Sequence, residues 1–280
     1  MDRLLIVDGS NLLFQMFFGM PARIVNERGK AIHGTLGFVG ALLKIIRATK
    51  PTHIAVLFDG EHENARSADD PDYKSNRPDY GQAPPEENPF SQLPDIFAAL
   101  GFLNIKYAET ADCEADDWIA GYALTCGTKA EVIISSFDSD FFQLITDKVS
   151  VLRYRGKNTV ICTPDYIKEK LCILPSQYAD FKSLTGDKAD NIKGAQGIGP
   201  KTAALLLNKF GTLENVIANA EKIKKPSVGS SVTESAGRLK TNYKLIKLGG
   251  GSPLPFCMSE LGYTRKDITT NEVLRGIGLR

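Results

Sequence analysis

The sequence has no long hydrophobic run, and its N-terminus lacks the features of a secretion signal. Across 280 residues, no apolar stretch approaches the roughly 18 residues that a membrane-spanning helix needs. The chain passes from Met1-Asp2-Arg3 into the apolar residues 4–7, a segment that is too short and too close to charges for a signal peptide. These absences predict a soluble, cytoplasmic protein with no membrane role.

Cysteine and histidine are also scarce. The three histidines, His33, His53 and His62, are scattered along the chain, so none is expected to bind a metal. The five cysteines are odd in number and form no Cys-x-x-Cys pair, which argues against a disulfide framework and against a zinc site. This pattern predicts buried thiols in a reducing compartment. The cysteines are Cys113, Cys126, Cys162, Cys172 and Cys257.

The net charge of +1 conceals an uneven distribution of charge. Residues 182–247 contain 12 Lys or Arg against 5 Asp or Glu, so this stretch is basic and the rest of the chain is acidic. A basic stretch is either a solvated face without a partner or a surface that attracts an anionic polymer. Composition alone does not choose between these two interpretations.

Three short apolar segments have the features of buried parallel strands, because they are rich in Leu, Ile and Val and are separated by helical patterns. They are residues 4–7, 54–58 and 132–134. Each ends at or shortly before acidic residues, which are Asp8, Asp59, and the pair Asp138 and Asp140. Ligands bind at the carboxyl ends of the strands in open α/β sheets, so we expect these four carboxylates to converge on one edge.

Two helices are predicted between these strands. Residues 35–47 carry apolar side chains at helical spacing, as a core crossover helix does. A second helix is expected from about Asp112, a suitable N-cap, through residue 123. It carries Glu114, Asp116 and Asp117, of which Glu114 and Asp117 share a face in a regular helix. All three can serve one site only at a frayed or tight first turn.

Residues 61–94 lack a clean period and are rich in Pro, Asp, Asn and Gly. A structureless stretch of this length is usually functional or disordered, and its position directly after Asp59 favours a lid or clamp over the site. Lys74 and Arg77 within it are either solvated surface charges or groups that stabilise a phosphate as it gains charge. Arg66, Tyr73 and Tyr80 are interspersed with them.

Nine acidic residues fall into five short motifs, with no histidine among them. Carboxylate oxygens select hard divalent ions such as Mg²⁺ or Mn²⁺ over zinc. Two such ions can clamp the attacking and leaving oxygens of a phosphoryl displacement, without a side-chain nucleophile. The alternative, that each Asp only caps a helix or turn, explains any one motif well but all five poorly. The nine are Asp8, Asp59, Glu114, Asp116, Asp117, Asp138, Asp140, Asp187 and Asp190.

The segment Gly197-Ile198-Gly199-Pro200-Lys201-Thr202 leads into an apolar helix over residues 203–210 that stops before Gly211. A glycine turn at a helix N-terminus presents backbone N–H groups and a positive dipole end, which bind phosphate without regard to sequence. The turn lies within the basic stretch, close to Lys193. It therefore predicts contact with a nucleic-acid backbone, although such a turn can also be only a tight helix connection. Asp187 and Asp190 lie directly before this turn, so phosphate binding at the turn is expected to be coupled to the metal site.

These motifs resemble, in kind and in order, those of the structure-specific 5′-nucleases, which include flap endonucleases and the 5′-nuclease domain of bacterial DNA polymerase I. The resemblance covers most of the chain and implies a stand-alone member of the family. It is carried by Val-Asp-Gly-Ser-Asn at 7–11, Phe-Asp-Gly at 58–60, Tyr-Lys-Ser-Asn-Arg at 73–77, Glu-Ala-Asp-Asp at 114–117, Asp-Ser-Asp at 138–140 with Gln143-Leu144, Gly-Asp-Lys-Ala-Asp-Asn at 186–191 and Gly-Ile-Gly-Pro-Lys at 197–201.

The resemblance implies an α/β fold with a PIN-like nuclease core, in which helices flank a mainly parallel central sheet. It also implies a helical arch formed by the insertion and a helix-hairpin-helix DNA-binding module. The expected division is a nuclease core over residues 1–170 with the arch at about 61–94, a helix-hairpin-helix region over 171–250, and a C-terminal segment over 251–280 that packs on the core.

A role for each site residue is implied as well. The nine carboxylates would bind two metal ions, with Asp117, Asp187 and Asp190 acting directly or through water at the second ion. Lys74 and Arg77 would be catalytic residues that approach the scissile phosphate. A K⁺ ion at the hairpin is a further expectation. DNA contacts are expected from Arg66, Tyr73, Lys193, Gly197, Gly199, Lys201 and Thr202.

The implied activity is that of a divalent-metal-dependent 5′-3′ exonuclease or flap endonuclease, which hydrolyses phosphodiester bonds in branched or 5′-ended DNA during replication or repair. Mg²⁺ is the expected ion, with Mn²⁺ as a substitute. Flap, nicked or 5′-overhang DNA is the expected partner, and RNA–DNA hybrid is a second one. The protein is expected to be a monomer.

The chain departs from the family pattern in two places. Phe137 and Ser139 stand where relatives more often carry glycine and a basic residue, and Asp69, Asp70 and Asp72 make the insertion unusually acidic for an element that a strand threads. Two rival functions stay open. A small α/β nuclease that cuts RNA would share the acidic pocket but lack the hairpin and the insertion. A DNA-structure binder without turnover would hold a metal only for architecture.

Overall fold

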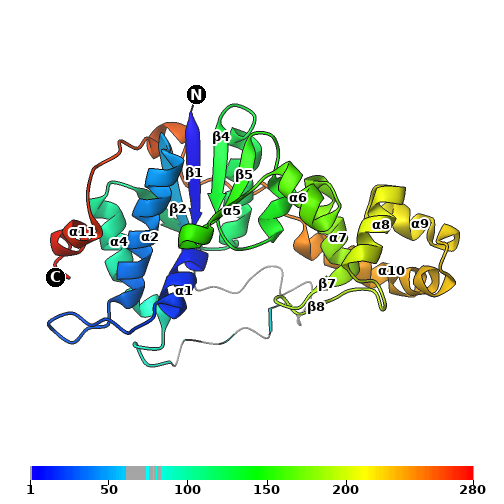
Figure 1. Cartoon of the computed structure of the whole chain (residues 1–280), viewed down its shortest axis with the longest axis horizontal. Helices are drawn as coiled ribbons and strands as arrows, with labels where there is room; N and C mark the ends of the chain where they lie inside the picture. The colour runs from blue at the N-terminus through cyan, green and yellow to red at the C-terminus, as the bar shows by residue number, and fades with distance from the viewer. Residues whose placement is uncertain (1, 61–73, 76–77, 79, 81–82, 280) are drawn as a thin grey trace.

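A six-stranded sheet in the order β3-β2-β1-β4-β5-β6 forms the centre of the molecule (Figure 1). The computed structural model describes residues 2–60, 74–75, 78, 80 and 83–279. All neighbouring strands are parallel except β5 and β6, which are antiparallel. The strands are β1 (Arg3–Asp8), β2 (His53–Phe58), β3 (Lys106–Glu109), β4 (Glu131–Ser135), β5 (Val149–Arg153) and β6 (Val160–Cys162).

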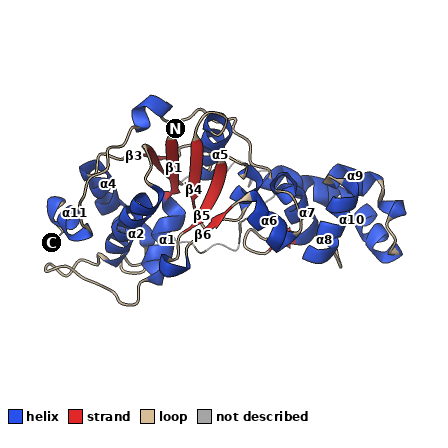
Figure 2. Ribbon diagram, turned by 45° about the horizontal axis from the view of Figure 1, so that its top comes forward, coloured by secondary structure: helices blue, strands red, loops and turns tan. Residues whose placement is uncertain are grey.

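Helices cover both faces of the sheet, which explains why β1 is apolar at every position from Leu4 to Val7 (Figure 2). On one face, Leu5 and Val7 pack against helices before and after β2. On the other face, Leu4 and Ile6 share a core with Ile119. The first face carries α1 (Gly9–Gly19), α2 (His33–Thr49), α4 (Leu93–Phe102) and α11 (Thr270–Gly276), and the second carries α5 (Ala115–Cys126), η2 (Asp140–Leu144), α6 (Pro164–Leu171) and α7 (Tyr178–Thr185).

The segment that follows α7 forms a helical region at one end of the sheet (Figure 1). A two-stranded hairpin, β7 (Gly186–Asp187) and β8 (Ile192–Lys193), separates α7 from three further helices. These are α8 (Pro200–Phe210), α9 (Leu213–Ala218) and α10 (Pro226–Ile246). Leu206 and Leu207 of α8 belong to the same hydrophobic cluster as the sheet, so the helical region and the sheet share one core. The remaining short helices are η1 (Pro89–Gln92), η3 (Gly156–Asn158), η4 (Pro175–Gln177), η5 (Ala220–Lys222) and η6 (Met258–Leu261).

The C-terminal residues pack on the sheet and on the helices of its first face. Gly262 forms a β-bridge with His53 of β2, and the backbone N–H of Tyr263 donates to the carbonyl of Thr52 (2.8 Å). Val273 of α11 is fully buried in the core that α2 and α4 form. The last helix therefore closes this layer of the fold.

The predicted α/β class and the mainly parallel sheet are confirmed. The three predicted strands lie in β1, β2 and β4, and the crossover helix lies in α2. One boundary was wrong. The helix expected from Asp112 begins at Ala115 with Glu114 as its N-cap, because the Asp59 side chain accepts the hydrogen bond from the first turn. The next helix, α4, begins at Leu93, close to the expected end of the insertion at about residue 94.

The expectation of buried thiols was wrong for most of the cysteines. All five are free in the described structure, but only Cys162 is buried. Cys172 and Cys257 are exposed, because they lie at the N- or C-terminal ends of short helices and not in strands. Within the described residues, no helix is long and apolar enough to cross a membrane.

Candidate metal centre and nucleic-acid interface

The carboxyl ends of β1 and β2 carry the first two carboxylates. Asp8 pairs in register with Leu57, so Asp8 and Asp59 leave the sheet at the same edge. Asp8 is buried and is the N-cap of α1, where its Oδ1 accepts a hydrogen bond from Asn11 N (3.0 Å). Asp59 is exposed, and its Oδ1 accepts a hydrogen bond from Ala115 N (2.9 Å) at the start of α5. A helix N-terminus therefore fixes the direction of each carboxylate.

The loop after β4 joins two more carboxylates to Asp8. Ser136 Oγ donates to Asp8 Oδ2 (2.8 Å) and accepts a hydrogen bond from Asp138 N (2.9 Å). Asp138 Oδ1 in turn accepts a hydrogen bond from Asp140 N (2.8 Å), at the start of η2. This chain of hydrogen bonds holds the loop that carries Asp138 and Asp140 beside Asp8 at the edge of the sheet.

The start of α5 contributes Glu114 and Asp116. Glu114 has an extended backbone (φ −81°, ψ 151°), so it stands outside the regular helix and does not follow the helical spacing used to predict its face. Asp116 lies close to the strand carboxylates, as the effect of the charges of Asp138, Asp59 and Asp8 on its pKa shows. Asp117 is half-buried, and its charge acts on the thiol of Cys113. Of the three residues, Asp116 is therefore the one that the strand carboxylates surround.

The β7–β8 hairpin brings the last two carboxylates to the same edge. One carboxylate oxygen each from Asp140, Asp187 and Asp190 lie within 4.8 Å of one another, the only such acidic group among the described residues. The hairpin is tight because Gly186 has φ +78° and a side chain there would lie 2.5 Å from the backbone nitrogen of Gly194. Glycine is therefore required at the base of the hairpin that carries Asp187.

Two lysines extend into the acidic centre. Lys182 of α7 forms ion pairs with Asp187 and, at 3.8 Å, with Asp140. Lys74 forms an ion pair with Glu114, and its backbone N–H donates to the carbonyl of Asp190 (3.1 Å). The Lys74 side chain is 15% exposed and the Lys182 side chain 14% exposed, so both charges are largely removed from solvent. The site thus already places two cations among its carboxylates.

Burial and mutual repulsion raise the pKa of several carboxyl groups. Burial, followed by the charge of Asp59, raises the pKa of Asp8 to about 7. Burial and the charge of Asp138 raise the pKa of Asp140 to about 7, and burial raises the pKa of Asp116 well above its usual range. Burial also raises the pKa of Asp138. Such shifts are expected where carboxylates crowd together at a site that binds a cation.

Charge also holds Lys182 in its protonated form. Burial opposes the positive charge, but the nearby Tyr178, Asp140 and Asp187 outweigh it and raise the pKa of Lys182. Asp140 Oδ1 is buried and accepts no hydrogen bond in the described structure, although Lys182 Nζ lies 3.8 Å away. An oxygen in this state is available to a stronger cationic partner.

The predicted phosphate-binding turn is exposed and open. Gly197 has φ +73°, and nothing lies within 4 Å of a side chain built at Gly197 or Gly199. Between them, Ile198 is 4% exposed and anchors the turn in the core. Gly199 is the N-cap of α8, and no side chain caps that helix end. Lys193 and Lys201 are exposed and Thr202 is half-buried, so the turn presents its backbone to solvent beside two lysines.

The structure brings eight of the nine predicted carboxylates, all but Asp117, together at this edge, but it does not describe every predicted residue. Arg66, Tyr73 and Arg77 lie outside the described residues, as do the three aspartates at 69, 70 and 72.

Sequence reasoning missed Lys182 and the hydrogen-bonding partners Ser136 and Asn11. Asn11 Oδ1 accepts a hydrogen bond from Phe137 N (3.0 Å), which ties the β4 loop to α1. Asn11 lies within one of the acidic motifs and Ser136 lies two residues before Asp138, so their position in the sequence could have marked them as partners of the carboxylates. Lys182 had no such signal, because it lies before the last acidic motif on a half-buried helical face.

Two family models match the chain in tandem. The model described as 5′-3′ exonuclease, N-terminal resolvase-like domain matches residues 3–172. The model described as 5′-3′ exonuclease, C-terminal SAM fold matches residues 173–269. This chain belongs to the 5′-3′ exonuclease family. The sheet with its acidic edge lies in the first region, and the glycine turn with α8 lies in the second.

Relatives match the chain to different extents. A 5′-3′ exonuclease of Aquifex aeolicus is 32% identical over 270 residues, which are 96% of this chain and 89% of that protein. DNA polymerase I of Bacillus caldotenax is 32% identical over 268 residues, which are 95% of this chain but 30% of the polymerase. The chain therefore spans less than a third of that polymerase.

The fold also matches solved structures of this family. The flap endonuclease of bacteriophage T5, in a complex with DNA and metal ions, has a TM-score of 0.70 and 25% sequence identity to this chain. The match covers 87% of this chain and 88% of that one. The shared fold and the shared family agree with the acidic centre as a place that can bind metal ions.

Proposed function

We propose that this chain is a metal-dependent 5′-nuclease that hydrolyses phosphodiester bonds in branched or 5′-ended DNA. The observation that carries the proposal is the gathering of carboxylates from five separate segments near the carboxyl edge of one sheet. The last of these segments continues directly into an exposed glycine turn at a helix N-terminus. Family membership and the similarity to a DNA-bound flap endonuclease support the same activity.

The residues fit divalent metal ions. The donors are all carboxylate oxygens, which suit Mg²⁺ or Mn²⁺. One of them, Asp140 Oδ1, is buried and accepts no hydrogen bond within the described chain. The proposed ligands are Asp8, Asp59, Glu114, Asp116, Asp138 and Asp140, with Asp117, Asp187 and Asp190 acting directly or through water at a second ion. When bound, the two ions would supply a nucleophile from water at neutral pH and offset the charge that the phosphate gains.

The reaction is a hydrolysis in which a water oxygen bonds to phosphorus. The bond between phosphorus and the leaving oxygen breaks, and that oxygen takes up a proton. We assign Lys74 to the stabilisation of the extra negative charge on the phosphate, because its ammonium group lies close enough to offset part of the rise in the pKa of Asp116 and Asp138 that burial causes. Arg77, from the same motif, is assigned the same role.

The glycine turn would hold the DNA away from the point of cleavage. Gly197 and Gly199 leave room for a phosphodiester to approach the backbone, and the start of α8 offers N–H groups and a positive dipole end. Lys193, Lys201 and Thr202 lie beside the turn, and Arg66 and Tyr73 would add contacts from the insertion. These contacts read the backbone and not the bases, so strand geometry would select the substrate.

Several finer features belong to the same proposal. Flap, nicked and 5′-overhang duplexes are the proposed substrates, with RNA–DNA hybrid as a further one and K⁺ as an ion at the glycine turn. The chain is proposed to act as a monomer, since every proposed ligand comes from one chain. Exposed Cys172 and Cys257 suit a reducing cytoplasm.

The test uses the purified chain with 5′-labelled flap, nicked and blunt duplexes, in Mg²⁺, in Mn²⁺ and in a chelator. We expect cutting near the flap junction in either metal and none in the chelator. Asp138→Asn should bind the flap DNA but not cut it. Asp165→Asn, a change at an exposed aspartate on α6, should cut like the wild type.

Two results would contradict the proposal. Binding of DNA without cleavage in any metal would favour a structural binder that uses the acidic centre only for architecture. Cleavage of single-stranded RNA with no cleavage of any DNA substrate would instead favour an RNA nuclease.

A further inference from the structure

Helix α10 is hydrogen-bonded along its length to the segment that leads into the glycine turn. Three of its side chains donate to three backbone carbonyls between β8 and that turn. The bonds are Ser231 Oγ to the carbonyl of Gln196 (2.8 Å), Arg238 Nη2 to that of Gly194 (3.1 Å), and Asn242 Nδ2 to that of Lys193 (3.0 Å). Asn242 is 3% exposed and also donates to the carbonyl of Ser183 in α7 (3.1 Å). The approach to the turn is therefore fixed to α10.

The C-terminal end of the same helix is hydrogen-bonded, through one buried side chain, to the loop after β4 that carries Asp138 and Asp140, which we call the acidic loop. Gln143 Nε2 donates to the carbonyl of Asp140 (2.9 Å) and to the carbonyl of Ile246, the last residue of α10 (3.0 Å). Gln143 Oε1 accepts a hydrogen bond from Leu248 N (2.9 Å). Both N–H groups of the amide and its oxygen are thus used, and the side chain is 8% exposed.

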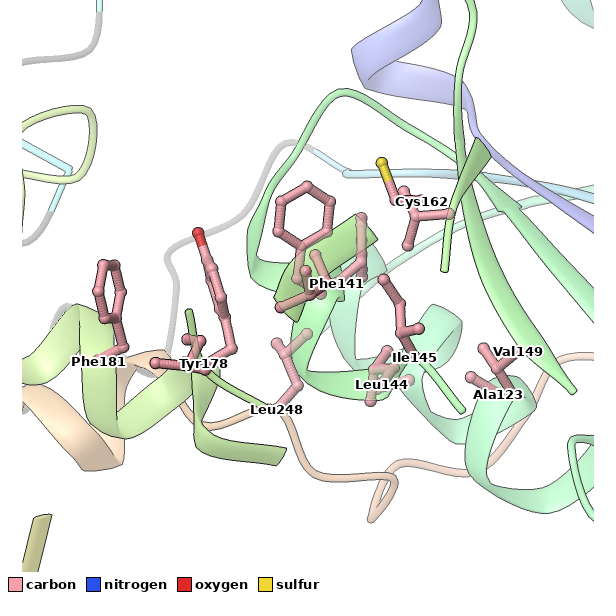
Figure 3. Packing of buried hydrophobic residues seen from close by; sticks show 14 of the residues in the cluster. Ala123, Phe141, Leu144, Ile145, Val149, Cys162, Tyr178, Phe181 and Leu248 are labelled. Atoms are coloured by element: carbon pink, nitrogen blue, oxygen red, sulfur yellow. The ribbon is translucent and has the colours of Figure 1, made fainter. Parts of the chain in front are cut away.

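These bonds stabilise a rigid connection. The last carbonyls of a helix have no partner within the helix, and Gln143 satisfies one of them from another element. Hydrophobic packing reinforces the connection, since Leu248 belongs to the same buried cluster as Tyr178 and as Phe141 and Leu144 of η2 (Figure 3). An unpaired amide at this place would be costly, because it is closed off from water.

We infer that Gln143 is a positioning residue, and that α10 acts as a rod that sets the distance between the glycine turn and Asp140. A phosphate held at residues 197–199 would then place one particular phosphodiester at the carboxylates. The inference rests on the proposed function, and it adds the device that selects the position of the cut. Loss of the Gln143 contact would let the acidic loop move relative to the bound strand.

The test compares Gln143→Met with a matched control, Gln177→Met. Gln177 makes the same pattern of bonds at the end of α8, to the carbonyls of Leu207 (3.2 Å) and Gly211 (2.8 Å) and from Leu174 N (2.9 Å). Both changes remove one buried or half-buried amide of equal size, but of the two only Gln143 donates a hydrogen bond to the acidic loop. Products from one labelled flap duplex are resolved to the single nucleotide, and kcat and KM are measured for each protein.

For Gln143→Met we expect kcat to fall by about tenfold or more, with KM within about twofold, since misplaced reacting groups slow the chemical step. New products should appear at positions next to the main cut. Gln177→Met should keep the single main product. If the two variants give the same product pattern and the same kcat, Gln143 has no positioning role.

A second variant covers the case in which Gln143→Met does not fold. Arg238→Ala changes an exposed residue at the other end of the connection and should also spread the products over neighbouring positions. A single product from a well-folded Arg238→Ala protein would overturn the inference. Wild-type protein in the same experiment separates failure of the positioning role from failure of the proposed function. If the wild type cuts the flap duplex and the variants behave like the control, only the positioning role is wrong. If the wild type cuts no substrate, the proposed function is wrong, and the positioning role is wrong as well.

Discussion

The two halves of the acidic centre are built in different ways. Asp8, Asp59 and Asp138 stand at the ends of neighbouring parallel strands, so the topology of the sheet brings them together. Asp187 and Asp190 stand on a hairpin whose strands are two residues long, and this hairpin depends on packing against other elements. We call these the sheet half and the hairpin half. The order of parallel strands is therefore enough to position the carboxylates of the sheet half. The carboxylates of the hairpin half also need side-chain contacts from other elements to hold them in place.

The halves also differ in the charges that balance them. In the hairpin half, Lys182 lies between Asp140 and Asp187. In the sheet half, Asp8 has a pKa of about 7, with burial as the main cause. Lys182 therefore neutralises part of the charge on the hairpin half, whereas Asp8 relies on a proton or a metal ion.

The largest expected difference is in catalysis. Asp138→Asn in the sheet half should slow single-turnover cleavage on the order of a thousandfold, because it removes a central ligand of the proposed ions. Asp187→Asn in the hairpin half should slow it by about tenfold to a hundredfold, and added Mg²⁺ should recover part of the loss. Rates are measured on a labelled flap duplex across a range of Mg²⁺ concentrations, with the exposed Asp147→Asn as a control. Equal losses at the two positions would remove the distinction between the halves.

Lys182→Met tests the charge balance of the hairpin half. Removing this cation leaves Asp140 and Asp187 facing each other, so the metal-free protein should lose about 2 kcal/mol of unfolding free energy. Mg²⁺ should restore much of the loss by replacing the missing charge. Denaturant unfolding with and without Mg²⁺ measures both effects. The exposed Lys170→Met should change stability by less than about 0.5 kcal/mol, and an equal loss for both lysines would contradict the account.

The raised pKa values of Asp8 and Asp140 should make the metal-free protein less stable as the pH rises. Asp8 and Asp140 have a pKa of about 7 in the folded chain, against an ordinary value of 3.8. Between these values the folded state binds more protons than the unfolded state, so the contribution of these two groups to stability is greatest below about pH 4 and is lost as the pH rises through 7.

The same reasoning predicts that Mg²⁺ raises the melting temperature more at pH 8 than at pH 5, since metal binding needs ionised carboxylates. Thermal melts at both pH values, in Mg²⁺ and in a chelator, test this prediction. A metal-free melting temperature that stays level between pH 5 and pH 8 would show that the two carboxyl groups do not titrate in this range.

The smallest expected effects concern the glycine turn. Gly199→Ala should leave the fold intact, because Gly199 has an ordinary φ of −93° and a side chain there meets nothing within 4 Å. It should weaken DNA binding by about twofold to fivefold if a phosphate approaches this backbone. Gly197→Ala should in addition cost about 1 kcal/mol of stability, because of its φ of +73°. Binding titrations at two salt concentrations measure the loss of DNA affinity, and thermal melts measure the loss of stability. Unchanged DNA binding in both variants would argue against phosphate binding at the glycine turn.

The sequence was a good guide to the sheet half. An apolar run that ends in Asp is a local signal, and the rule for parallel sheets converts three such runs into one edge. It was a poorer guide at the start of α5, where Asp59 supplies the cap from a distant strand and Glu114 leaves the helix. A local pattern cannot show a hydrogen bond that depends on the tertiary fold.

The contacts behind the hairpin half could not be read from the sequence. Helix α10 lies in a stretch that has Ser, Gly and Lys throughout and gave no clear pattern. Gln143 and Asn242 are polar residues in buried positions, and their importance comes only from the carbonyls that they reach. Lys182 likewise gains its meaning from carboxylates on another element. Residues of this kind become visible only when the packing is known.

The most direct test of the central claim is to locate bound ions by anomalous scattering from crystals of Asp138→Asn and of the wild type, grown with Mn²⁺ near pH 8. The account predicts two Mn²⁺ peaks in the wild type, one in contact with the sheet half and one beside Asp140, Asp187 and Asp190. In Asp138→Asn, the peak at the sheet half should weaken or vanish. A wild-type crystal with no peak among the nine carboxylates, or with ions only at other places, would contradict the account.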